Sequence, residues 1–144
     1  AYAALANKGV YTEPILYTHI YDRNDNLIYE KSPKTQVAVK QSTAYLITSA
    51  MRDVVTKGTG KSARLSGVTC AGKTGTTTNN YDKWFVGFTP TLVGATWVGY
   101  DTPKTLKGLS GASYPADIWV GIQKELNQDK PEKEFDKTEY LASK

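Results

Sequence analysis

Three strand-like runs separated by very short turns constrain the fold of this chain more than any other feature. They span residues 68–77, 83–88 and 92–100. The segments between them contain Asn79, Asn80 and Pro90, residue types that favour tight turns. Connections this short join antiparallel neighbours, because parallel strands need a crossover of about a dozen residues or more. The runs therefore predict an antiparallel meander.

Two amphipathic segments are expected to pack on this sheet as helices, over residues 42–57 and 115–126. Ser42 or Thr43 is a candidate N-cap for the first helix, and Pro115 suits the first turn of the second. The small residues Ala95 and Gly99 predict that a helix packs closely on the strand face they share with Val93 and Trp97. The expected apolar stripes are Ile47, Ala50, Met51, Val54 and Val55 in the first helix, and Ile118, Trp119, Ile122 and Leu126 in the second.

The rest of the chain divides into a helical start, a hairpin and a charged end. Residues 1–8 resemble the end of a helix, and because they start abruptly we expect this chain to be a fragment. Residues 18–21 and 27–30 flank a cluster of turn-forming residues and predict a hairpin. Residues 129–144 are rich in Lys and Glu, which indicates a tail or linker. The predicted class is α+β, with one domain portion over residues 1–128 and the tail over 129–144.

The composition excludes several classes of function. The 144 residues carry a net charge of +4 with scattered lysines, so nucleic-acid binding is not indicated. A lone Cys70 and a lone His19 exclude an internal disulfide and make a zinc site or a Ser-His-Asp triad improbable. Cys70 lies in an apolar strand start and is expected to be a small buried hydrophobe. No metal or cofactor is expected.

Residues 71–78, AGKTGTTT, hold the candidate site. Lys73 offers a point charge, Thr74 and Thr76 offer hydroxyl donors for a carboxylate, and Gly75 leaves room for close backbone approach. Pleat alternation sends Lys73 and Thr74 to opposite faces, so both reach one ligand only if it docks along the strand edge. The alternative is a solvated edge strand whose lysine discourages aggregation.

The same stretch also matches the phosphate-binding P-loop pattern, G-x-x-x-x-G-K-[ST], over residues 67–74. That pattern needs a buried strand before it and a helix N-terminus after it. Residues 61–66 do not resemble a buried strand, and residues 75–80 are poor helix formers. We therefore disfavour this interpretation.

Residues 71–77 resemble the K-T-G signature of penicillin-binding proteins, which accompanies S-x-x-K and S-x-N. Further stretches resemble the bifunctional class A group of that family, in the same order. These are residues 3–14, the Gly-Thr-Gly loop 58–60, and residues 82–90 with 97–101. The resemblance implies part of a penicillin-binding or serine β-lactamase-like transpeptidase fold.

Neither S-x-x-K nor S-x-N occurs in the 144 residues. The resemblance thus implies that the nucleophilic serine, its lysine base and a second serine lie upstream, outside this chain. The membrane anchor and glycosyltransferase domain of the class A group would lie there too. The implied enzyme is a serine-type D-Ala-D-Ala transpeptidase, of which this chain alone would be inactive.

The resemblance also assigns roles to the strand. Lys73 would support proton transfer and attract the acyl donor, and Thr74 and Thr76 would hold its terminal carboxylate. The Thr76 N–H would serve the oxyanion hole, and Gly75 and Thr77 would line the substrate site. The implied partners are peptidoglycan stem peptides and β-lactams, on the outer face of the bacterial cytoplasmic membrane. The alternative is a non-catalytic relative that binds peptidoglycan or β-lactams through K-T-G and has lost the serine.

Overall fold

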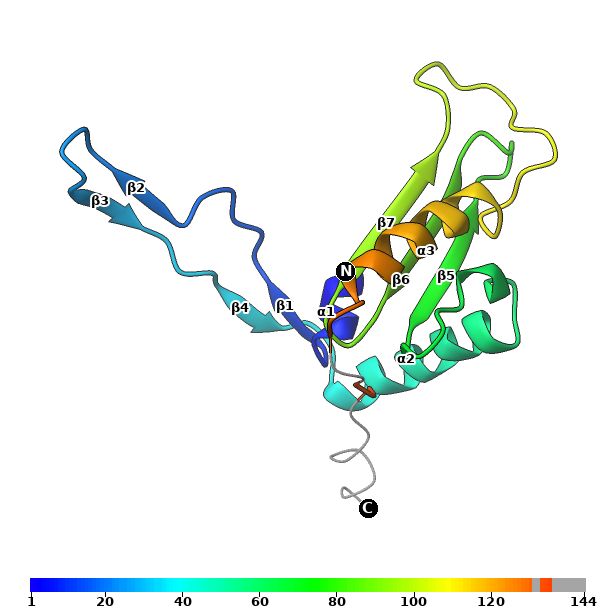
Figure 1. Cartoon of the computed structure of the whole chain (residues 1–144), viewed down its shortest axis with the longest axis horizontal. Coiled ribbons are helices and arrows are strands. Elements are labelled where there is room, and N and C mark those ends of the chain that lie inside the picture. Colours follow the sequence, from blue (N-terminus) through cyan, green and yellow to red (C-terminus); the bar gives the residue numbers. More distant parts are fainter. Residues whose placement is uncertain (131–132, 136–144) are drawn as a thin grey trace.

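The computed structural model describes residues 1–130 and 133–135, which form a mixed α+β body with a projecting arm (Figure 1). The body holds a three-stranded sheet with three α-helices around it, and the arm consists of two two-stranded ladders. The elements in chain order are α1 (Tyr2–Ala6), β1 (Val10–Thr12), β2 (His19–Tyr21), β3 (Leu27–Glu30), β4 (Thr35–Val37), α2 (Gln41–Thr56), the 3₁₀ turn η1 (Lys61–Ala63), β5 (Ala71–Thr76), β6 (Lys83–Phe88), β7 (Val93–Val98) and α3 (Tyr114–Leu126). No helix in this part of the chain is long and apolar enough to cross a membrane.

The three-stranded sheet is the predicted meander. Its order is β5-β6-β7 with both pairs antiparallel, so β5 is an edge strand. Lys73 lies opposite Val86, and Thr76 lies opposite Lys83. The prediction of an antiparallel sheet with packed helices is confirmed.

A row of three glycines crosses the sheet and lets aromatic rings lie on its backbone. Gly72 pairs with Gly87, which pairs with Gly94. A Cβ on Gly72 would lie 2.5 Å from Cζ of Phe85, and one on Gly87 would lie 2.8 Å from Cζ2 of Trp119. The indole Nε1 of Trp119 donates a hydrogen bond to the Gly94 carbonyl at 3.2 Å. The main hydrophobic core, which includes both rings, forms on this face.

This glycine row corrects the prediction of which face a helix covers. The expected face, with Val93, Ala95 and Trp97, is exposed, and Val93 keeps 43% of its surface. Ala95 and Gly99 predict a helix on that face, whereas helix α3 packs on the opposite face, where Trp119 lies beside Gly94. Because Gly87 and Gly94 have no side chains, α3 approaches the sheet more closely than alanine at these positions would allow.

The predicted apolar stripe of α3 is wrong except for Trp119, which is 1% exposed. Ile118, Ile122 and Leu126 face outward, and Ile122 keeps 52% of its surface. The buried residues of the helix are Pro115, Ala116, Trp119 and Gln123. The close fit of Trp119 to the glycine backbone sets the orientation of α3. Ala116 and Gln123 are therefore buried, in place of three larger apolar residues.

The predicted orientation of α2 is half right. Met51 and Val55 are buried as expected, whereas Ile47 and Ala50 are exposed. The buried side of the first half consists of Ala44 and Thr48, because α1 packs closely across α2 and small side chains permit that approach. The predicted cap is also wrong, since Lys40 occupies the N-cap position and no side chain bonds there.

The arm contains the predicted hairpin, in which β2 pairs antiparallel with β3, followed by the β1–β4 ladder. Figure 1 shows the arm extending away from the three-stranded sheet. Asp22 shapes the hairpin turn by accepting hydrogen bonds from the side-chain amide and backbone N–H of Asn26 and from the N–H of Asn24. These bonds, led by the Asn26 side chain, lower the pKa of the Asp22 carboxyl.

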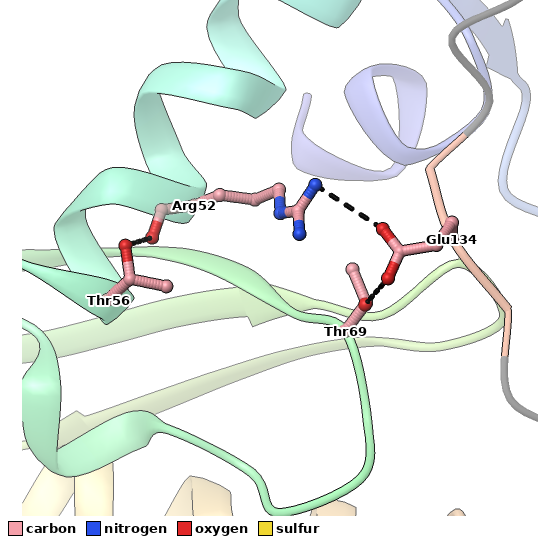
Figure 2. A network of polar contacts seen from close by, with 4 residues as sticks. All are labelled: Arg52, Thr56, Thr69 and Glu134. Carbon is pink, nitrogen blue, oxygen red and sulfur yellow. Dashed lines mark hydrogen bonds and ion pairs between the residues drawn. The ribbon is translucent and has the colours of Figure 1, made fainter.

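A short C-terminal piece, residues 133–135, returns to the body (Figure 2). Arg52 of α2 pairs with Glu134 at 3.3 Å, and the Thr69 hydroxyl donates to the same carboxylate. The Phe135 ring meets Phe88 edge-on at 5.5 Å between centroids. This piece of the predicted tail is therefore packed on the body. The rest of the tail beyond Lys130 lies outside the described residues, and the boundary at residue 128 stays a prediction.

Candidate functional site

The candidate site is built on edge strand β5, which presents different groups on its two faces. Lys73 and Gly75 share one face, and Thr74 and Thr76 share the other, as the pleat requires. Lys73 and Thr76 are exposed, whereas Thr74 and Gly75 are half-buried. Among the described residues, β5 pairs only with β6, so its second edge carries no strand.

Lys73 folds back along its own strand. Its Nζ donates a hydrogen bond to the Thr74 carbonyl at 2.8 Å. The ammonium group thus lies beside the backbone of the next residue, although the two side chains point to opposite faces. This hydrogen bond joins Lys73 to the main chain of Thr74, so the joint use of the lysine and the Thr74 hydroxyl by one ligand stays a prediction.

The half-buried Thr74 has a hydroxyl partner that sequence reasoning did not single out. Thr59 Oγ1 lies 3.1 Å from Thr74 Oγ1. Thr59 belongs to the loop between α2 and η1, whose residues 58–60 resemble a loop of the family named above. A single threonine between two glycines, directly after a helix end, is the signal that could have drawn attention to it.

A second loop, residues 106–113, packs on the backbone of the same strand. Gly111 is buried, and a Cβ there would lie 2.3 Å from the Trp84 carbonyl oxygen and 3.0 Å from the Gly75 nitrogen. Ser62 of η1 donates a hydrogen bond to the Ala112 carbonyl at 2.5 Å. The 106–113 loop is thus joined to η1, and it rests directly on the Gly75–Trp84 pair.

Thr77 organises the turn between β5 and β6. Its hydroxyl oxygen accepts hydrogen bonds from the N–H groups of Tyr81 at 3.2 Å and Asp82 at 3.0 Å. The Thr77 N–H also bonds to the Asp82 carbonyl at 3.2 Å. These contacts assign the oxygen to the turn, and the role of Thr77 in substrate binding stays a prediction.

Lys83, opposite Thr76, is a fully buried lysine with 0% exposure that the sequence did not single out. Its Nζ donates a hydrogen bond to Asn80 Oδ1 at 2.6 Å, and the Asn80 carbonyl accepts one from the Leu106 N–H at 2.9 Å. Lys83 and Asn80 therefore tie the end of β5 to the start of the 106–113 loop. This contact fixes the turn next to the candidate site.

The structure rules out the P-loop. Strand β5 continues through Gly75 and Thr76, where a P-loop would begin a helix. Residues 64–70 before it form no strand. The phosphate-binding interpretation of residues 67–74 is wrong.

Cys70, directly before β5, is buried as predicted, with its thiol 3.7 Å from the Ala63 carbonyl. Burial, as the largest influence, raises the pKa of this thiol.

Cavities of about 320 Å³ and 520 Å³ lie away from the candidate site, the first beside α1 and residues 133–135 and the second beside the end of α3. Neither is lined by β5. No cluster of three or more His, Cys, Asp or Glu that could hold a metal occurs within residues 1–130 and 133–135.

The amino-acid sequence of this chain is similar to those of known proteins. A family model described as "Penicillin binding protein transpeptidase domain" matches residues 1–118. The chain is 34% identical over 137 residues to penicillin-binding protein 1A of Aquifex aeolicus, covering 94% of this chain and 19% of that relative. It therefore spans about a fifth of the length of that protein.

Solved structures show the same fold. Penicillin-binding protein 1A of Haemophilus influenzae superposes with a TM-score of 0.83 at 24% identity, over 96% of this chain and 27% of that one. A D,D-transpeptidase domain of a peptidoglycan glycosyltransferase from Eggerthella lenta gives a TM-score of 0.65 at 29% identity, over 85% and 30% of the two chains.

Proposed function

The chain belongs to the penicillin-binding protein transpeptidase family, and on that premise we propose that it is the C-terminal part of a serine D,D-transpeptidase of class A. Such an enzyme cross-links peptidoglycan stem peptides and is acylated by β-lactams. The reaction is acyl transfer. A serine attacks the peptide bond between two terminal D-alanines, the second D-alanine leaves, and the serine ester then passes the acyl group to an amine of a neighbouring stem.

The observation that carries the proposal is the arrangement of charge and hydroxyl groups along edge strand β5. The Lys73 ammonium lies 2.8 Å from the Thr74 carbonyl, and the Thr74 hydroxyl emerges from the opposite face of the same strand. A donor lying along the edge would meet a cation and a hydroxyl together. Charge-assisted hydrogen bonds of this kind are the strong ones for a carboxylate.

Each residue of the strand then has a role. Lys73 attracts the carboxylate and supports proton transfer at the serine, while Thr74 and Thr76 donate hydroxyl hydrogen bonds to the carboxylate. The Thr76 N–H completes an oxyanion hole, in which one donor commonly contributes about a hundred- to a thousandfold in rate. Gly75 lets the donor backbone approach, and Thr77 borders the same site.

The remainder of the active site would come from outside this chain. The sequence lacks S-x-x-K and S-x-N, and the chain spans 19% of its relative from Aquifex aeolicus. We propose that the serine nucleophile, its lysine base and the second serine lie in the preceding part of the same domain. A membrane anchor elsewhere in the protein would hold that domain on the outer face of the bacterial cytoplasmic membrane.

The test is covalent labelling with a fluorescent penicillin. The full-length protein should be labelled stoichiometrically, and the label should map to a serine outside these 144 residues. The segment alone should remain unlabelled, because it lacks the nucleophile. An unlabelled full-length protein that still binds peptidoglycan would favour a non-catalytic binding relative instead, and stoichiometric labelling of the isolated segment would show that the serine has been misplaced.

A further inference from the structure

We propose that Thr59 is a positioning residue that turns the Thr74 hydroxyl toward the carboxylate of the acyl donor. This inference rests on the proposed function and adds a residue to it. It starts from the 3.1 Å contact between the two hydroxyl oxygens. Thr59 and Thr74 are fifteen positions apart in the chain, so the contact depends on how the loop is held against β5.

The main chain on both sides of Thr59 is anchored to the end of α2. The Gly58 N–H bonds to the Asp53 carbonyl at 2.9 Å, and the Gly60 N–H bonds to the Val54 carbonyl at 3.0 Å. Both glycines lie so close to the helix that a Cβ would be 2.9 Å from Val54 Cα at Gly58 and 3.1 Å from Val54 Cγ1 at Gly60. Thr59 is thus presented to Thr74 from a fixed backbone.

The hydroxyl pair has a preferred direction once a carboxylate is bound. A threonine hydroxyl has one proton to donate and two lone pairs that accept. If Thr59 donates to Thr74, the single proton of Thr74 is left for the carboxylate, and successive hydrogen bonds in such a chain strengthen one another. Without Thr59, the Thr74 hydroxyl can rotate away from the carboxylate of the acyl donor. The expected order is therefore Thr59 to Thr74 to carboxylate.

A competing arrangement is that Thr59, which is exposed, binds the carboxylate directly. The two arrangements differ in whether the effects of replacing Thr59 and Thr74 on the acylation rate are independent. Residues in one hydrogen-bonded chain are coupled, so removing Thr59 should have no effect after Thr74 is removed. Two independent carboxylate ligands would give effects that multiply.

The experiment measures acylation of the full-length protein by a depsipeptide donor ending in a free carboxylate, and by the same donor ending in a carboxamide. With the carboxylate donor, Thr59→Val should slow acylation by about three- to tenfold, as expected for one neutral hydrogen bond. Thr59→Ser should restore the rate. The double variant Thr59→Val, Thr74→Val should match Thr74→Val alone. With the carboxamide donor, whose carbonyl oxygen accepts only a neutral hydrogen bond, Thr59→Val should slow acylation less than it does with the carboxylate donor.

Thr56→Val is the matched control, because the Thr56 hydroxyl bonds within α2 to the Arg52 carbonyl at 3.0 Å. It should acylate at the parent rate. Three results would overturn the role of Thr59 while Thr74→Val still slows the reaction: a parent rate for Thr59→Val, multiplied effects in the double variant, or equal slowing with the carboxamide donor. A parent rate for Thr74→Val would instead overturn the proposed site itself.

Discussion

Replacing Gly111 by alanine should damage the candidate site through the backbone of β5, without removing any side chain that is proposed to bind substrate. The added Cβ would lie 2.3 Å from the Trp84 carbonyl oxygen and 3.0 Å from both the nitrogen and the oxygen of Gly75. These are backbone atoms of paired strands, which cannot turn aside as a flexible side chain can. Ordinary contact needs about 3.5 Å, so the loop must retreat by about 1 Å.

That retreat should affect stability and rate to different extents. Overpacking of a buried position typically costs about 1–3 kcal/mol of unfolding free energy. The peptide bond that follows Gly75 carries the Thr76 N–H, and a misplacement of about 1 Å at a catalytic group can cost about a hundredfold in rate. We therefore expect acylation of the full-length protein by a fluorescent penicillin to slow by about ten- to a hundredfold, measured well below the melting temperature.

Gly121→Ala provides the control, because no atom lies within 4 Å of the position that its Cβ would occupy. It should leave acylation unchanged and should not lower the melting temperature, since alanine is favoured over glycine in a helix. If Gly111→Ala acylates at the parent rate and melts at the parent temperature, the 106–113 loop does not rest on β5 as described, and the proposed support of the Thr76 N–H is wrong.

Two further substitutions and one alkylation experiment probe single residues. Thr76→Val should slow acylation by about ten- to a hundredfold, because one charge-assisted hydrogen bond is worth about 1.5–3 kcal/mol. The melting temperature of the protein should hardly move, because the Thr76 side chain is exposed. Gly94→Ala should lower the unfolding free energy by about 1–3 kcal/mol in denaturant titration, since its Cβ would lie 2.9 Å from Trp119 Nε1; an unchanged midpoint would contradict the close packing of α3. Because burial raises its pKa, Cys70 should be alkylated by iodoacetamide at pH 8 far more slowly in the native protein than in urea, and equal rates would show that the thiol is exposed.

The meander and the hairpin could be predicted because they depend on local signals. Short turns between β5, β6 and β7 fix the strand order, and the turn residues at 22–26 fix the hairpin. The K-T-G residues could be found for the same reason, since they are consecutive in one strand. In each case, residues close in the chain carry all the information that the prediction used.

The orientation of the helices could not be predicted, because it depends on contacts between distant segments. Trp119 lies on Gly94 and Gly87, and this fit turns Ile118 and Ile122 outward against the hydrophobic pattern of the helix. The pattern records which residues are apolar, but it does not record where the sheet lacks side chains. The glycine row becomes visible only when the register of the three strands is known.

The support around the site was missed for a similar reason. Thr59 and Gly111 reach β5 from loops whose sequences indicate only turns, and the contacts that matter are with Thr74 and with the backbone of Gly75. The buried Lys83 also occupies a strand position where a lysine would ordinarily be assigned to the surface. Its burial follows from the way the β5–β6 turn and the 106–113 loop close over it through Asn80.

We propose that β5 binds the carboxylate of the acyl donor in a serine transpeptidase. A crystal structure of the full-length protein acylated by penicillin tests it most directly. We expect an ester on a serine outside this segment, with the penicillin carboxylate within hydrogen-bond distance of the Thr74 and Thr76 hydroxyls. The ester carbonyl oxygen should lie about 2.7–3.1 Å from the Thr76 nitrogen. An adduct whose carboxylate is held by other residues, away from both threonines, would contradict it.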